Sequence, residues 1–141
     1  AEAREYAAVL LESDAPALTL LGRANNALVA IAEGDLAQAE AIVGEIGSEA
    51  ATLYLQACLD RARENPKGAI RTVTRIIAEH ANDVQWMAPS ELLSARLYLD
   101  MAMTNSAANT ARQVKNIYAG THISADAAEL QRQLGGGGEQ P

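Results

Sequence analysis

The stretch Gly34-Asp35-Leu36-Ala37-Gln38-Ala39 decides the fold, because it combines a tight turn with the start of a helix. Glycine readily adopts the left-handed backbone conformation that ends a helix, and aspartate is a preferred residue at the start of the next one. A link this short leaves the two flanking helices side by side, so we expect them to run antiparallel. The stretch therefore predicts a helical hairpin.

The same pattern recurs along the chain. Glu64-Asn65-Pro66-Lys67-Gly68-Ala69 lies thirty positions further on and aligns with the first stretch. Two apolar pairs keep this offset: Val43 with Val73, and Ile46 with Ile76. Leu53-Tyr54-Leu55 also returns as Leu97-Tyr98-Leu99. Recurrence of this kind indicates an array of repeats rather than a single bundle.

Capping residues and apolar spacing elsewhere predict an all-α protein. Residues 72–77 are rich in β-branched side chains, but their apolar members follow a helical spacing. We expect Pro89 to start a helix after a loop that carries Trp86, and Ser124 to cap the last helix. Eight helices are predicted, near residues 2–12, 15–33, 35–46, 49–64, 66–81, 90–103, 106–119 and 124–134.

The composition supports one folded domain and argues against several classes of partner. The chain has 141 residues, of which 49% are hydrophobic, so it can bury a core. Its net charge of −7 disfavours binding to nucleic acid or to anionic lipid. The longest apolar runs, Tyr6–Leu11 and Ala27–Ala32, are far shorter than the ~20 residues that cross a bilayer.

Residues 3–119 resemble the tetratricopeptide repeat family. The family consensus has a small residue early in the first helix, a Gly-Asp turn, and an alanine four residues after the aspartate. Ala27, Gly34-Asp35 and Ala39 match it. Ala8–Pro16 is similar to the end of a repeat with its closing proline. The resemblance implies a right-handed α-solenoid of antiparallel helical hairpins, a superhelix whose first helices line a concave face.

The later copies depart from the family pattern, with Asn65-Pro66 at the second turn and Thr104-Asn105 at the third. We expect about three hairpins over residues 1–134, with an unpaired first helix and a capping helix at the C-terminal end. Residues 135–141 contain four glycines and no apolar side chain, which predicts a disordered tail. Because the first helix lacks a hairpin partner, we expect the chain to be a fragment or a processed form.

No side-chain motif indicates catalysis or a metal site. His80 and His122 have no second ligand at metal-binding spacing, and Cys58 lacks a Cys-x-x-Cys partner. The chain has no nucleophile elbow or Walker loop, and its one glycine cluster, Gly135–Gly138, opens no helix. We therefore expect a protein that is not an enzyme and that needs no cofactor or metal.

Candidate partner-binding residues follow from the resemblance. Tyr54 and Tyr98 occupy matching places in the Leu-Tyr-Leu repeats, and in the family this place faces the groove. The same resemblance implies that Leu28 lines this groove and that Arg61 lies at its edge. Partly exposed tyrosines there would offer contact area to a peptide or protein, whereas buried ones would belong to the hairpin core.

A basic band at residues 61–75 interrupts an otherwise acidic chain. Such a band would favour a partner with acidic character, because arginine forms bidentate contacts with carboxylates. Alternatively, the band is an ordinary solvated surface in which Arg75 pairs with Glu79 and Asp60 with Arg63. The residues leave both interpretations open.

Two functions are therefore carried forward. The first is a non-catalytic interaction module that binds a peptide or protein on its concave face. The second is a structural segment of a longer solenoid or a self-associating scaffold, for which Tyr6 and Leu10 of the first helix are candidates for weak contact between copies. The alanine and arginine bias is typical of bacterial proteins, and both cytoplasm and periplasm fit it.

Overall fold

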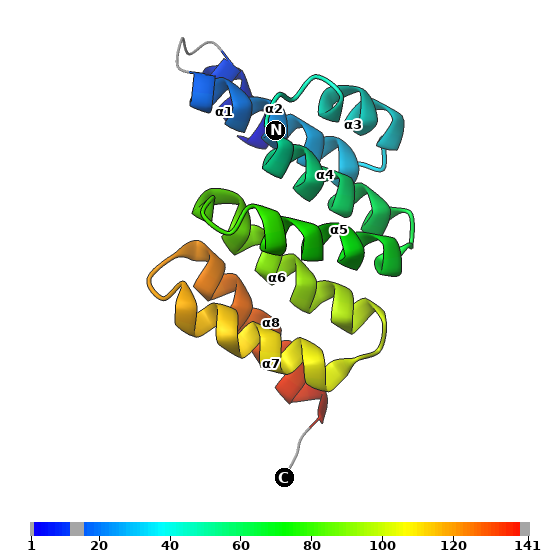
Figure 1. Ribbon diagram of the computed structural model, residues 1–141, viewed down its shortest axis with the longest axis vertical. Coiled ribbons are helices and arrows are strands. Elements are labelled where there is room, and N and C mark those ends of the chain that lie inside the picture. Colours follow the sequence, from blue (N-terminus) through cyan, green and yellow to red (C-terminus); the bar gives the residue numbers. More distant parts are fainter. Residues whose placement is uncertain (1, 12–15, 139–141) are drawn as a thin grey trace. The chain divides into compact units, whose positions relative to one another are not determined.

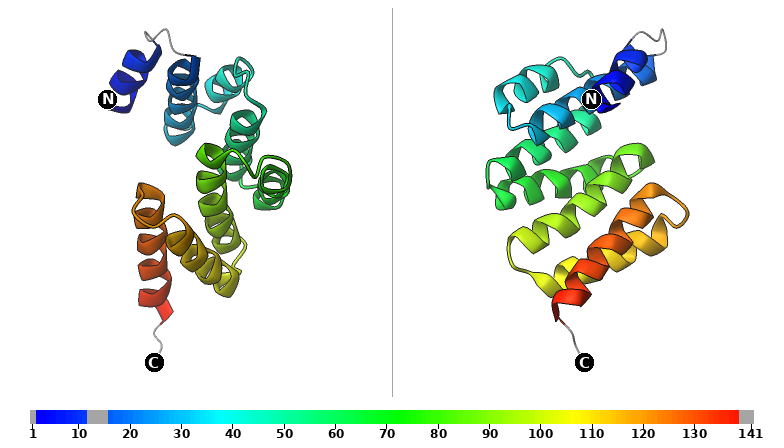
Figure 2. Two further views of the ribbon diagram at one scale, coloured as in Figure 1. Left: turned by 60° about the vertical axis from the view of Figure 1, so that its left-hand side comes forward. Right: turned by 180° about the vertical axis from the view of Figure 1, so that it is seen from behind.

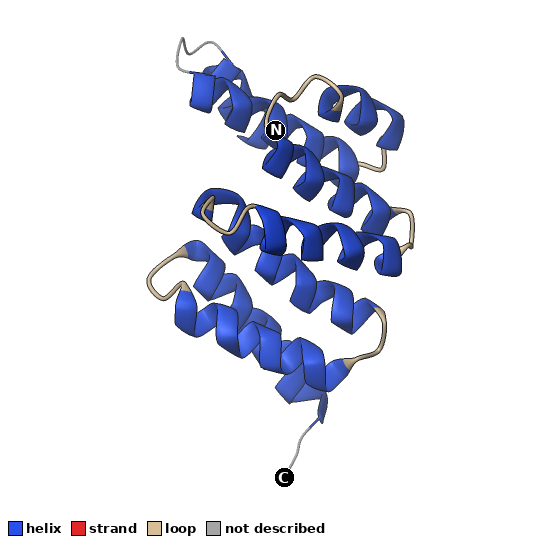
Figure 3. Ribbon diagram, in the orientation of Figure 1, coloured by secondary structure: helices blue, strands red, loops and turns tan. Residues whose placement is uncertain are grey.

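The computed structural model describes residues 2–11 and 16–138, and over these ranges it is all-α, with eight helices and no strand (Figures 1 and 3). The all-α prediction is confirmed to this extent. Within the same ranges, no helix has the length and apolar character that crossing a membrane requires. The helices are α1 (Glu2–Leu11), α2 (Pro16–Ala32), α3 (Leu36–Val43), α4 (Glu49–Ala62), α5 (Pro66–Glu79), α6 (Val84–Asp100), α7 (Thr104–Ile117) and α8 (His122–Gly138).

The chain divides into two compact units, residues 1–72 and 73–141, and α5 begins in the first and ends in the second. In the first unit, α2 packs against α1, α3 and α4, and α3 also packs against α4 (Figure 2). The side chains at the centre of these contacts are small. Ala27, Ala30, Ala39 and Ala57 are completely buried, so the helices approach one another closely.

The second unit is built from α6, α7 and α8, each of which contacts the other two (Figure 2). One of its core clusters joins the middle of α6 to the other two helices, through Ala95, Ala111 and Leu130. A second cluster lies nearer the start of α6 and consists of Ala88, Leu92, Val114, Ile123 and Ala127. Tyr118 and Leu134 pack against the edges of these clusters.

Three of the turns between helices share one geometry. In each, a residue with positive φ follows the helix: Gly34 (82°), Glu64 (61°) and Ala102 (59°). The next residue donates its N–H to the carbonyl five residues earlier: Asp35 to Ala30 (2.9 Å), Asn65 to Asp60 (2.9 Å) and Met103 to Tyr98 (2.8 Å). This is the hydrogen bond of a Schellman-type helix end. The turn predicted at Gly34-Asp35 is therefore present three times.

The buried residues around these turns also recur at fixed positions. Counted from the second residue of each turn (Asp35, Asn65 and Met103), completely buried alanines lie four residues later, at Ala39, Ala69 and Ala107, and eight residues earlier, at Ala27, Ala57 and Ala95. Two further buried positions follow each turn: Val43, Val73 and Ala111, and then Ile46, Ile76 and Val114. The chain therefore contains three copies of one helix–turn–helix pattern.

The turn of the third copy lies two residues earlier than the sequence indicates. The turn lies at Ala102-Met103, whereas we predicted it at Thr104-Asn105. Turning two residues earlier places Ala107 in the fully buried position that Ala39 occupies in the first copy. Burial therefore decides this boundary, although asparagine and threonine are the better turn and capping residues.

This register also corrects the proposed equivalence of the two tyrosines. Tyr54 lies ten residues before Glu64, near the middle of α4, whereas Tyr98 lies only four residues before Ala102. The backbone carbonyl of Tyr98 takes part in the turn itself, because it accepts the N–H of Met103. The two Leu-Tyr-Leu stretches therefore do not mark the same place in the repeat.

Helix α6 begins six residues before the predicted start. Trp86 lies in its first turn with 6% of its surface exposed, and Pro89 lies inside the helix. Proline has no N–H for the preceding turn, which is why it indicated a helix start. Here the hydroxyl of Ser90 donates to the carbonyl of Trp86 at 2.5 Å, and burial of Trp86 and Met87 stabilises the extra turn.

The last helix differs from the prediction at both ends. α8 begins at His122, and Thr121 acts as the capping residue because its Oγ1 accepts the N–H of Ser124 at 3.3 Å. Ser124 is thus not the cap; its hydroxyl donates to the carbonyl of Lys115 in α7 at 2.8 Å. The helix continues to Gly138, into the segment expected to be a disordered tail, and residues 139–141 lie outside the described part of the chain.

Candidate binding cleft of the first unit

A cleft of about 480 Å³ lies in the first unit, between α3, α4 and the middle of α5. One wall is the polar face of α4, which carries Thr52, Gln56 and Asp60. Residues four apart lie above one another on a helix, so these three side chains form a single stripe. Leu59 and Arg63 of the same helix and Thr72 of α5 also line the cleft.

The opposite wall is the end of α3, with Glu40, Val43 and Gly44. An ion pair joins the two walls, because the guanidinium of Arg63 contacts the carboxylate of Glu40 at 2.7 Å. Arg63 is the C-cap of α4 and has left the helical conformation, so it reaches α3 rather than Asp60. The predicted pair of Asp60 with Arg63 is therefore wrong.

Besides the paired Arg63 and Glu40, two polar side chains of the cleft bond to the protein and two do not. The hydroxyl of Thr52 donates to the carbonyl of Ile46 at 3.4 Å, and that of Thr72 to the carbonyl of Gly68 at 3.3 Å. Within residues 2–11 and 16–138, the carboxylate of Asp60 and the amide of Gln56 contact no hydrogen-bonding or ionic partner. These two groups are the ones that the cleft offers to a ligand.

The sequence-predicted partner-binding residues do not line this cleft. Leu28 and Tyr54 are partly buried, and Arg61 is exposed on another side of α4. Tyr98 is partly buried and belongs to the second unit, so the four do not form one site within a single unit. The sequence signal that we missed is the polar stripe at four-residue spacing in α4.

The sequence matches no protein-family model, no curated protein and no solved structure at significant similarity. Membership of a family is therefore not shown by comparison. What is shown is an all-α chain with eight described helices, in which consecutive helices pack from α1 to α4 in the first unit and from α6 to α8 in the second, with one turn pattern present three times.

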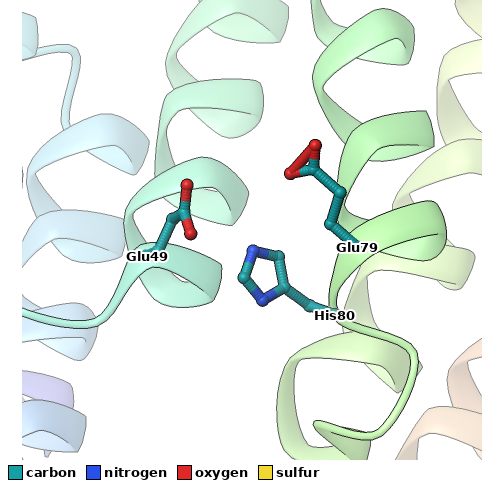
Figure 4. Close-up of side chains that lie close together, drawn as sticks. All are labelled: Glu49, Glu79 and His80. Carbon is teal, nitrogen blue, oxygen red and sulfur yellow. The ribbon is translucent and has the colours of Figure 1, made fainter.

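Figure 4 draws three side chains that can ligate metal ions, Glu49, Glu79 and His80. Glu79 and His80 are adjacent at the end of α5, where Arg75 holds the carboxylate of Glu79 at 2.9 Å, as the sequence predicted. Glu49 lies in the first turn of α4. Because Glu49 belongs to the first unit and the other two to the second, we assign no metal site to them.

The second unit contains one carboxylate in an unusual environment. Burial raises the pKa of Glu91 in α6 above its ordinary value, and a hydrogen bond from the Tyr118 hydroxyl opposes this shift to a lesser degree. Burial also raises the pKa of Tyr118, and the nearby charge of Glu91 adds to the effect. This pair ties the middle of α6 to the end of α7.

The raised pKa of Glu91 predicts that the unit loses stability as pH rises. In the unfolded chain, Glu91 releases its proton near 4.5, whereas in the folded chain it keeps the proton to a higher pH. The folded state therefore binds more protons between these values, so the contribution of Glu91 to the free energy of unfolding falls across that window. Urea unfolding at a series of pH values should show this slope for the parent chain and a smaller one for Glu91→Gln. Equal slopes would show that Glu91 titrates normally.

Proposed function

We propose that the chain is a tetratricopeptide-like helical repeat, a right-handed solenoid of antiparallel hairpins. The support is the threefold turn with its recurring buried alanines at Ala27, Ala57 and Ala95. A helical pair cannot bury its apolar stripe alone, whereas stacked pairs bury it against their neighbours. This chain repeats both the turn and the small residues at the helix contacts, and stacking of helical pairs requires both.

We propose further that the protein is a non-catalytic interaction module whose partner is a peptide or protein. Stacked repeats present long surfaces, and their usual use is to bind extended segments of other chains. Leu28, Tyr54 and Arg61 of the first unit and Tyr98 of the second are the proposed contacts on the concave face. The observation that carries the proposal is the threefold recurrence of the turn.

Selection from a random-peptide display library against the intact chain tests this function. We expect peptides with a shared sequence pattern to be enriched, and fluorescence anisotropy to show that Arg61→Ala weakens their binding. Arg112→Ala removes the same side chain from the exposed surface of α7 and serves as the matched control. Failure to enrich any peptide above the level of an unrelated helical protein would contradict the proposal.

One observation favours the scaffold function as a second candidate. Val9 of α1 is 67% exposed, although it is apolar and β-branched. The side chains of Tyr6 and Leu10, which we predicted to mediate self-association, lie outside the described side chains. Val9 is therefore the apolar residue of α1 on which a contact between copies can be tested.

The scaffold function predicts weak self-association that Val9→Glu abolishes, since a buried, unpaired carboxylate opposes apolar contact. Sedimentation equilibrium at high protein concentration measures it, with Ala37→Glu on the exposed surface of α3 as the control for added charge. A strict monomer for the parent chain at every concentration would rule out self-association through α1 and leave the interaction module.

A further inference from the structure

We propose that the cleft between α3, α4 and α5 binds the basic side chain of a lysine or arginine in a partner peptide. The inference deepens the proposed interaction function and rests on it for the source of the peptide. It assigns a place and a charge preference that the sequence did not indicate. Three features carry it: the charge balance of the cleft, the direction of its helices, and the mixture of apolar and acceptor groups on its walls.

The charge balance of the cleft is negative. Its lining contains two carboxylates, Glu40 and Asp60, and one guanidinium, Arg63. The guanidinium is engaged with Glu40 at 2.7 Å, so that pair is close to neutral. The carboxylate of Asp60 contacts no cation within the described ranges. A ligand with a positive charge would complete the pairing, whereas a carboxylate or phosphate would meet Asp60 as a like charge.

The helix directions add to this preference. Val43 and Gly44 are the last residue and the C-cap of α3, and Asp60 lies in the last turn of α4, with Arg63 as its C-cap. The C-terminal ends of both helices thus contribute to the lining, and α4 also lines the cleft nearer its start, at Thr52. The carbonyl groups at such ends carry partial negative charge and stabilise cations. Near Asp60 and near Gly44, these carbonyl groups favour a positively charged ligand, whereas the part of the cleft beside Thr52 does not add to this preference.

The apolar and polar groups of the cleft suit the shape of a basic side chain. Val43 and Leu59 are nearly buried apolar residues that line it, and they can contact an aliphatic stem. Gln56 supplies an amide oxygen beside the free carboxylate of Asp60. Lysine and arginine combine an apolar stem with a cationic end that needs acceptors. The cleft volume of about 480 Å³ accommodates such a side chain.

This charge preference is opposite to the one expected from the basic band. Residues 61–75 are rich in arginine, and the band predicted a partner with acidic character. Of its basic residues, only Arg63 lines the cleft, and Arg63 is already paired with Glu40. Arg61 and Arg71 are exposed but line other surfaces. An acidic partner and a basic side chain in the cleft would therefore bind at different places on the first unit.

A nuclear magnetic resonance titration of the intact, ¹⁵N-labelled chain tests the inference. The probes are three capped tripeptides with lysine, norleucine or glutamate between two glycines. We expect the lysine peptide to shift the backbone amides of Gln56, Asp60 and Arg63, and the other two to leave them unchanged. Norleucine has the lysine stem without its charge, so equal shifts from both peptides would overturn the assignment of a cation site.

Variants of Asp60 make the test specific. Asp60→Asn should weaken binding of the lysine peptide about tenfold, because the amide oxygen still accepts a hydrogen bond but no longer carries the charge that strengthens it. Asp60→Glu should restore most of the binding. Asp126→Asn makes the same change on the exposed surface of α8, outside the first unit, and should leave binding unchanged. Equal weakening by Asp60→Asn and Asp126→Asn would show that only the net charge matters and would contradict a site in the cleft.

The display selection separates this inference from the proposed function. If peptides are enriched but bind equally well to Asp60→Asn, the cleft does not bind their basic side chains and the interaction function stands. If no peptide is enriched but the lysine tripeptide shifts the cleft residues, the cation site stands and the general interaction function fails.

The backbone carbonyl of Asp60, which accepts the N–H of Asn65, is retained in every variant, so the turn is preserved.

Discussion

Trp86→Ala is expected to lower the free energy of unfolding by about 3–5 kcal/mol, the range for removing a large aromatic side chain from a core. Trp86 lies in the first turn of α6 with 6% of its surface exposed, and its backbone carbonyl accepts the hydroxyl of Ser90. Its truncation leaves a cavity and removes the burial that extends the helix ahead of Pro89. Chemical denaturation, followed by circular dichroism, measures the change.

Val84→Ala is the matched control for this change. Val84 is the first residue of α6 and is 63% exposed, so its truncation should change the free energy of unfolding by no more than about 0.5 kcal/mol. An equally small effect for Trp86→Ala would mean that the indole is not part of the core. The segment before Pro89 would then behave as the loop that the sequence predicted.

Ala95→Leu is expected to destabilise the protein by about 1–3 kcal/mol, because it inserts a large side chain where three helices meet. Ala95 of α6 is completely buried and packs with Ala111 of α7 and Leu130 of α8. No space remains for extra methyl groups unless the helices move apart. Thermal and urea unfolding of the variant measure the loss.

Two further variants test whether the effect depends on the buried, repeated position. Ala57→Leu, at the same place in the preceding copy, should be destabilising to a similar degree, because Ala57 is also completely buried. Ala125→Leu, at an exposed position of α8, should be close to neutral. A large effect at Ala95 combined with no effect at Ala57 would show that the two positions are not equivalent, and the case for a repeat would weaken.

The described helices show which parts of the fold local sequence decides. The turn at Gly34-Asp35 was predictable because glycine permits positive φ and the carboxylate of Asp35 accepts the N–H of Gln38 at 3.2 Å. Pro66 at the start of α5 was predictable for a similar reason, since proline fits the first position of a helix. Both signals act within a few residues, so no knowledge of distant contacts is needed.

The cleft was beyond this kind of reasoning. The stripe of Thr52, Gln56 and Asp60 is visible in the sequence, but a polar stripe on a helix is usually just a solvated face. It becomes one wall of a cleft because α3 ends opposite α4 and Arg63 turns toward Glu40. The sequence pointed instead to the pairing of Arg63 with Asp60, which is closer along the chain.

The sequence by itself determined the helical class, the first turn and the spacing that brings Val43 and Val73 to the same buried position. Tertiary structure decided the helix ends that weak local signals left open. Ala102 adopts positive φ without being glycine, and α6 runs through Pro89, because these arrangements bury Ala107 and Trp86. The free energy gained by burying such side chains exceeds the cost of an unfavourable turn residue or of one missing backbone hydrogen bond. Burial depends on contacts between residues that are distant in sequence, so local sequence signals do not reveal it.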